Sequence, residues 1–412
     1  MVSARRRTRM TQTKLSGPTI ALLCLMSGFT PLITDGFLAA VRPIMLDFQV
    51  PLSGAQATIS IVLFGCACAQ LFIGALADRY GRRPVLTASI VVFIAASIGV
   101  GLAPSLPALL VCRFVQGASA ASGPILARAI VRDVYNRVDG ARVLSVLAAG
   151  LALIPLLVPG INAYNVVRFG WRATAVLYVS VLLVALFMTR RYLRETLRPE
   201  DVTPFRISSV LSASREALAN RRVLGYILCC VSGYGGLAVW ISASPHLITG
   251  WFGTPPAQFG FYWALTILAY FSGGWASVRL LRRSTPDHLL LCGSTLLVAA
   301  AVVLTMAYHW LPHSLPAFLF GIGLYTFSWS MLQPNAQSGA LAPFQASAGR
   351  VSALLGFLQM SGGACVAQLF GRLHDGTPRA AITLIGAAAL LNVTVRWLFC
   401  PVRSAHGSAA RE

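Results

Sequence analysis

The sequence predicts an all-α protein that crosses a lipid bilayer with twelve helices. Of the 412 residues, 56% are apolar and only 11% are charged, whereas a soluble domain carries about 25% charged residues. The apolar residues fall into twelve stretches of about 20 residues, the length of a helix that spans a bilayer. Helices are expected because backbone groups inside the bilayer must be hydrogen-bonded within their own segment. The stretches are 18–40, 55–77, 85–103, 106–127, 143–165, 172–190, 223–248, 257–278, 288–308, 315–337, 351–370 and 380–400.

A long polar segment separates two sets of six spans. Eight arginines lie between positions 190 and 222, and we predict a cytoplasmic linker there, in which 206–219 forms an interfacial helix. The predicted organisation is a basic N-terminus (1–17), a first six-helix bundle (18–192), the linker (193–221), a second six-helix bundle (222–400) and a tail (401–412).

The two bundles are predicted to be pseudo-symmetric. A shift of 200 residues aligns Gly274 with Gly74 and the arginines at 279, 282 and 283 with those at 79, 82 and 83. Matched loops at the same place in each half are typical of an internal repeat.

The net charge of +21 is a feature of nucleic-acid-binding proteins, but its distribution argues against that class. With the N-terminus inside, 27 of the 33 basic residues fall in cytoplasmic segments. This bias predicts that both termini are cytoplasmic. The remaining six are Arg42, Arg113, Arg168, Arg172, Arg372 and Arg379.

Residues 74–86, which read GALADRYGRRPVL, form a short charged turn between two spans. Gly74 lets another backbone approach, and Gly81 permits a tight turn. A basic turn that only obeys the positive-inside rule would account for the arginines, but not for Asp78 between two glycines. The candidate residues of this loop are Gly74, Asp78, Arg79, Gly81, Arg82 and Arg83.

Two opposite charges lie inside spans at matching depth. Asp35 is the one acidic residue within the twelve predicted spans, and Arg113 is the one arginine deep within a span. At about 1.5 Å per residue, both lie roughly 8–10 Å below the outer edge. A buried carboxylate in a membrane is a functional candidate, so we predict that Asp35 exchanges protons and that Asp35 and Arg113 form a functional pair. A structural ion pair or a hydrogen bond between helices is the alternative.

Polar and aromatic side chains within spans are candidates for lining a substrate cavity. Pro334 interrupts the tenth span and would expose backbone carbonyls there. Interfacial or lipid-facing positions are the alternative for the aromatic residues. The candidates are Gln116, Tyr234, Trp240, Tyr325, Gln333, Asn335 and Gln359.

The loop at 74–83 resembles the signature G-x-L-x-D-R-x-G-R-R of the major facilitator superfamily and matches every fixed position. The resemblance implies the major facilitator fold, and it implies a cytoplasmic gate formed by this loop. R-x-x-Q-G at 113–117 resembles the fourth-helix motif of the same family, which implies a role for Arg113 in proton transfer. Shorter matches, such as Q-P-N-A at 333–336, resemble the Bcr/CflA (bicyclomycin-resistance) branch of drug efflux proteins.

Two segments depart from that branch. Arg42 and Pro43 follow the first span where the branch has L-P-A-L-P. The antiporter motif of the fifth helix is eroded, since Ile154 replaces a glycine. Pro155, Pro159 and Gly160 remain, and we expect a kink in the helix there.

We therefore expect a monomeric, proton-coupled exporter of small amphiphilic or hydrophobic compounds in a bacterial inner membrane. The proton gradient would drive it, with no cofactor, metal or nucleic acid involved. The eroded motif leaves proton-coupled uptake of a small organic nutrient open. A receptor or membrane enzyme is the third alternative, but the sequence lacks clustered catalytic groups.

Overall fold

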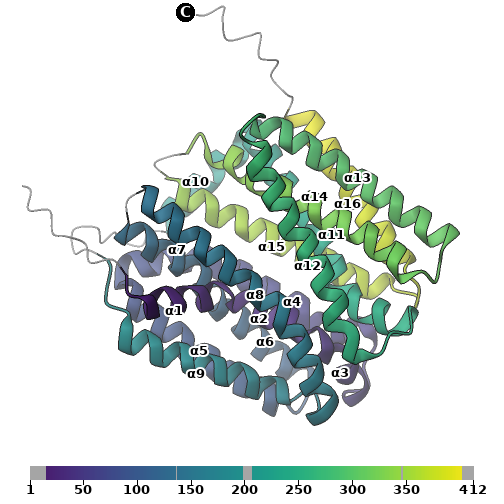
Figure 1. The fold of residues 1–412 in the computed structure, drawn as a ribbon. Helices are drawn as coiled ribbons and strands as arrows, with labels where there is room; N and C mark the ends of the chain where they lie inside the picture. Colours follow the sequence, from purple (N-terminus) through teal and green to yellow (C-terminus); the bar gives the residue numbers. More distant parts are fainter. Residues whose placement is uncertain (1–14, 136, 198–206, 345–346, 401–412) are drawn as a thin grey trace, which may run out of the picture.

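The computed structural model describes residues 15–135, 137–197, 207–344 and 347–400, and all regular elements in these ranges are helices. Figure 1 shows the helices of the first half, in purple to teal, beside those of the second half, in green to yellow. The first half contains α1 (Gly17–Ser27), α2 (Phe29–Thr34), η1 (Asp35–Ala40), α3 (Val41–Asp47), α4 (Leu52–Tyr80), α5 (Arg82–Leu102), α6 (Leu106–Ala120), α7 (Ser122–Val134), α8 (Arg137–Phe169) and α9 (Ala173–Tyr192).

The second half follows α10 (Ile207–Ala219), which confirms the helix predicted within the linker. Its elements are α11 (Arg221–His246), η3 (Leu247–Trp251), η4 (Pro256–Gln258), α12 (Phe259–Leu280), α13 (Pro286–Trp310), α14 (Leu315–Leu341), α15 (Ala348–Leu373) and α16 (Arg379–Phe399).

Within the described residues, eleven helical segments are long and apolar enough to cross a membrane. The predicted span at 257–278 corresponds to α12, which is not among the eleven because its tyrosines and tryptophans lower its mean hydropathy. With 22 residues, α12 measures about 33 Å at the usual rise per residue, so its length suffices. Eleven of the twelve predicted spans thus overlap helical segments that are long and apolar enough to cross a membrane, and the count of twelve stays a prediction.

Several predicted boundaries were wrong, the first span most of all. Instead of one helix over 18–40, the chain forms α1, breaks at Gly28, and continues through α2, η1 and α3 to Asp47. The apolar run spans this break, so hydropathy alone could not locate it. The fourth span is divided at Ala121, and helix α7 continues to Val134, beyond the predicted end at 127.

Hydrogen bonds join the two halves along the junction. We call the end where α4 meets α5 at Gly81 the loop end, and the end where α4 begins at Leu52 the far end. At the far end, Gln56 Nε2 donates to Ser242 O at 2.6 Å, and Gln368 Nε2 donates to Ser53 O at 3.1 Å. Helices α4 and α15 also pack against each other along the junction.

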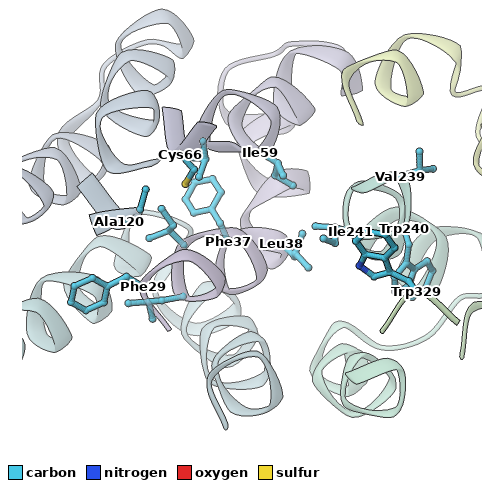
Figure 2. Close-up of a cluster of buried hydrophobic side chains, with 14 of the residues drawn as sticks. Phe29, Phe37, Leu38, Ile59, Cys66, Ala120, Val239, Trp240, Ile241 and Trp329 are labelled. Atoms are coloured by element: carbon cyan, nitrogen blue, oxygen red, sulfur yellow. The ribbon is translucent and has the colours of Figure 1, made fainter. Parts of the chain in front are cut away.

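Apolar packing holds each half together. Figure 2 shows Phe37 and Cys66 in one group of buried side chains and Trp240 and Trp329 in another. Leu38 lies between the groups, on η1, which contacts α11 across the junction. The broken first span therefore belongs to the surface between the halves.

Close helix approach within the first half depends on Gly117. A Cβ atom added there would collide with the backbone of Val62 on α4. We expect Gly117→Ala to lower the free energy of unfolding by about 1–3 kcal/mol, because a helix backbone must shift to admit the methyl group.

Thermal unfolding in detergent tests this expectation, with Gly349→Ala as the control. Gly349 lies in the first turn of α15 with nothing within 4 Å of an added Cβ, so alanine there should be neutral or slightly stabilising. Equal effects of the two substitutions would contradict the packing argument.

Candidate functional site

Asp35 lies where the first span changes from α-helix to 3-10 helix. Helix α2 ends at Thr34, and Thr34 Oγ1 donates to Asp35 Oδ1 at 2.9 Å. The next carbonyl, that of Gly36, accepts a hydrogen bond from Asn162 Nδ2 on α8 at 2.5 Å. A side chain of a neighbouring helix thus satisfies a backbone group at the irregular turn that carries Asp35.

Arg113 is completely buried, and its guanidinium group is held by neutral acceptors. It donates to Ile33 O at 2.8 Å, to Thr58 O at 3.2 Å and to Gln116 Oε1 at 2.9 Å. The guanidinium carbon lies 3.8 Å from the ring centroid of Phe37, in cation–π geometry.

No ion pair joins Asp35 and Arg113 among the described residues, which contradicts the alternative of a structural ion pair, while their joint role in proton transfer stays a prediction. Arg113 instead contacts Ile33, which lies two positions before Asp35, and Phe37, which lies two positions after it. Depth along the membrane normal fixes the height of a side chain but not its direction around the helix. Arg113 therefore positions the turn that carries the carboxylate.

Tyr178 on α9 is a member of this site that the sequence analysis missed. Its side chain is fully buried, its hydroxyl has no hydrogen-bond partner, and it lies within electrostatic range of Asp35 and Arg113. A Cβ added at Gly36 would lie 3.1 Å from this hydroxyl. A lone tyrosine in an apolar run carries no signal of such a role, since tyrosine is common at membrane interfaces.

Side chains of the second half approach the same region. Tyr234 on α11 is half-buried, lies within electrostatic range of Asp35, and packs against Trp329 with ring centroids 6.3 Å apart. Tyr270 on α12, a second residue the sequence analysis missed, donates to Gln333 Oε1 at 3.3 Å. Tyr270 also interacts electrostatically with Tyr234, so three helices of the second half contribute polar groups here.

Other candidate cavity residues have protein partners in this structure. Tyr325 Oη donates to Gly233 O at 3.0 Å, Asn335 Nδ2 donates to Ser277 Oγ at 3.0 Å, and Gln116 Nε2 donates to Ser97 Oγ at 2.9 Å.

Two other candidates, Trp240 and Gln359, are buried, and their described side chains donate no hydrogen bond to another residue. Trp240 stacks on Trp263 with centroids 6.2 Å apart, and its indole N–H is unpartnered. Gln359 is 6% exposed. Contact of these residues with a substrate stays a prediction.

Salt bridges connect the loop at 74–83 to a neighbouring helix. Arg82 bonds Asp78 Oδ1 at 2.5 Å and Asp133 Oδ2 of α7 at 2.9 Å. Gly81 has φ +99°, in the region that favours glycine, as expected for a tight turn. Arg79 lies over the ring of Tyr80 at 5.0 Å.

Gly74 marks an open surface on α4 in this structure. An added Cβ there would have no neighbour within 4 Å, so the predicted close approach of another backbone is absent in the conformation described.

Glu195, just after α9, caps the first turn of α5 and was missed by the sequence analysis. Its carboxylate accepts from Arg82 N at 2.9 Å and Arg83 N at 3.1 Å. Burial disfavours the charged form, but four backbone N–H groups outweigh burial, so the pKa of Glu195 is lowered. A carboxylate at a helix N-terminus is favourable, and it fastens the start of the linker to the loop.

The fifth span is one continuous helix, α8, with Pro155 and Pro159 inside it. Ile154, which replaces the expected glycine, fills the space at Gly28, where the first span breaks. Gly160 faces Gly260 of α12 closely enough that a side chain on Gly260 would collide with it. The eroded motif thus packs against both the first span and the second half.

Three features define the class of protein, which is a membrane transporter of the facilitator type. They are the helical bundle in two halves, the carboxylate in a broken first span, and the charged loop between the second and third spans. Residues 23–367 match the Major Facilitator Superfamily, and the chain belongs to this family.

Curated relatives agree with the predicted branch. The chain is 27% identical to Multidrug resistance protein D of Escherichia coli, over 94% of this chain and 96% of that protein. It is 24% identical to the Bicyclomycin resistance protein homolog of Haemophilus influenzae, over 93% and 96%. It is 28% identical to Multidrug resistance protein MdtL of Klebsiella pneumoniae, over 90% and 93%.

Solved structures share the fold. A D-xylose-proton symporter superposes with a TM-score of 0.74 at 15% identity, over 93% of this chain and 97% of that one. The human organic anion transporter MFSD10 superposes with a TM-score of 0.66 at 20% identity, over 93% and 98%.

Removing the cap should loosen the loop. We expect Glu195→Ala to speed amide hydrogen exchange in the first turn of α5 and to cost about 0.5–1 kcal/mol, because a largely exposed cap is screened by solvent. Since the folded-state pKa is lowered, this contribution is present at neutral pH and is lost as the pH falls below the ordinary glutamate value of about 4.3.

Glu216→Ala on α10 is the matched control, because Glu216 is exposed outside the loop. The capping role is wrong if both variants exchange at the wild-type rate in residues 82–85.

Proposed function

We propose that this protein exports small amphiphilic compounds in exchange for protons, by alternating access across a bacterial inner membrane. The loop end would face the cytoplasm together with both termini, as the arginine distribution favours. The names of the relatives support drugs as substrates. The observation that carries the proposal is Asp35, a nearly buried carboxylate at the change from α-helix to 3-10 helix, within electrostatic range of Tyr178 in the first half and Tyr234 in the second.

Protonation of Asp35 changes the charge balance of its surroundings. With the carboxylate ionised, Asp35 and Arg113 together are neutral, and the unpartnered hydroxyl of Tyr178 is a donor suited to an anion. With Asp35 protonated, the same region carries the uncompensated charge of Arg113. Because charge inside a membrane is costly, proton and substrate occupancy would favour different arrangements of the two halves.

The contacts between halves suggest which state this is. Gln56 and Gln368 bond across the junction at the far end, while Gly74 near the loop end has an open face. We assign this conformation to a state closed on the outer side. In this state Asp35 would release its proton toward the cytoplasm and a substrate would bind. After the halves rock, a proton from outside would displace the substrate.

Asp35→Asn should abolish accumulation of fluorescent amphiphilic drugs by inverted vesicles under a pH gradient, because asparagine cannot carry the proton. Asp47→Asn is the matched control. Asp47 ends α3 and bonds Arg172 and Trp171 at the far end, so its variant should transport at nearly the wild-type rate. Gradient-driven accumulation that survives Asp35→Asn would refute Asp35 as the proton carrier.

Proton-driven uptake is the second candidate, and Ile154 is the observation that favours it, since the antiport motif has a glycine there. The direction of transport distinguishes export from uptake. Export predicts gradient-driven accumulation in inverted vesicles, whereas uptake predicts accumulation of small nutrients in right-side-out vesicles.

A further inference from the structure

A cavity of about 390 Å³ lies at the far end between the two halves. Residues of η1, α3, α4 and α8 line it from the first half, and residues of α11, η3, η4 and α12 line it from the second. Most are apolar, and the polar side chains include Arg42, Gln56 and His246. This size and lining are typical of small-molecule sites.

Two basic side chains from opposite halves line this cavity. Arg42 on α3 and His246 on α11 come from opposite halves and interact electrostatically. His374, just after α15, stands behind His246 with ring centroids 4.2 Å apart. Burial and the neighbouring His246 lower the pKa of His374 to about 4, so His374 is neutral at physiological pH.

No acidic residue lines the described cavity. The nearby carboxylates are already bound elsewhere, since Asp47 accepts from Arg172 at 2.6 Å and Asp375 accepts from Thr377 Oγ1 at 2.7 Å. Arg42 therefore has no carboxylate partner among the residues that line this cavity.

Gln56 supplies an independent sign of a ligand. Its side chain is fully buried and lines the cavity, yet Oε1 has no hydrogen-bond partner. A buried acceptor without a partner costs about 1–3 kcal/mol. A ligand with an N–H or O–H group would satisfy it.

We propose that this cavity binds organic acids that combine an apolar ring, a hydrogen-bond donor and a carboxylate. The carboxylate lies between Arg42 and His246, the ring packs on the apolar wall, and the donor reaches Gln56. The inference goes beyond the proposed function by naming a ligand class, and it rests on that function only for placing the cavity on the transport path. Because both halves contribute, a bound acid holds the far end closed.

Binding should depend on pH through His246. The titratable groups near His246 are Arg42 from α3 and the neutral His374, whose neighbour is Asp375. An anion between Arg42 and His246 favours the protonated imidazole, so affinity should rise as the pH falls from about 8 to about 6.

Calorimetry on the purified full chain tests the site with indole-3-acetate and its neutral match, indole-3-acetamide. We expect the acid to bind at least about tenfold more tightly than the amide. Arg42→Gln should remove this preference, and Arg42→Lys should restore part of it. Arg168→Gln is the control, since Arg168 is an exposed far-end arginine outside the cavity. His246→Gln should abolish the pH dependence.

Equal affinity for acid and amide in the wild type, or an unchanged preference in Arg42→Gln, would overturn the inference. The outcome is separable from the proposed function. If the protein binds the acid but does not transport drugs, the acid site is supported and drug export is refuted. If the protein exports drugs but does not prefer the acid over the amide, drug export is supported and the acid site is refuted.

Discussion

The hydrogen bond from Arg113 to the carbonyl of Ile33 is the constraint on which the central site depends. It places a permanently charged group against the backbone just before Asp35, while Asn162 bonds the carbonyl just after it. A break in a membrane helix is tolerated when neighbouring side chains satisfy the freed backbone groups. Side chains from two helices of the first half, α6 and α8, therefore satisfy the backbone of the turn that carries the carboxylate.

The two ends of the bundle are secured in different ways, and this difference permits movement. At the loop end, Arg82 of α5 forms salt bridges with Asp78 of α4 and Asp133 of α7. Glu195, at the start of the linker, accepts a hydrogen bond from the backbone N–H of Arg82. These contacts lie within the first half, so they can move as one body. At the far end, Gln56 and Gln368 bond to backbone carbonyls across the junction, and only a few such bonds must be exchanged when the halves rock.

Sequence patterns predicted most of the fold and part of the site. Apolar runs located the spans, and the glycine and charges of the 74–83 loop predicted its turn, because these signals are local. The break at Gly28 lies inside an unbroken apolar run, and the contacts of Tyr178 and Glu195 join segments far apart in the chain. Such contacts depend on the direction of side chains around packed helices, which hydropathy does not encode. For the same reason, the matching depth of Asp35 and Arg113 could not show whether the two side chains contact each other.

Proton release during substrate binding tests the central role of Asp35 most directly. The purified protein in weakly buffered detergent solution would be mixed with a transported drug while pH and binding are followed together. The wild type should release protons as the drug binds, and Asp35→Asn should bind the drug without release. Release of the same number of protons by the variant would contradict the assignment and place the coupling group elsewhere.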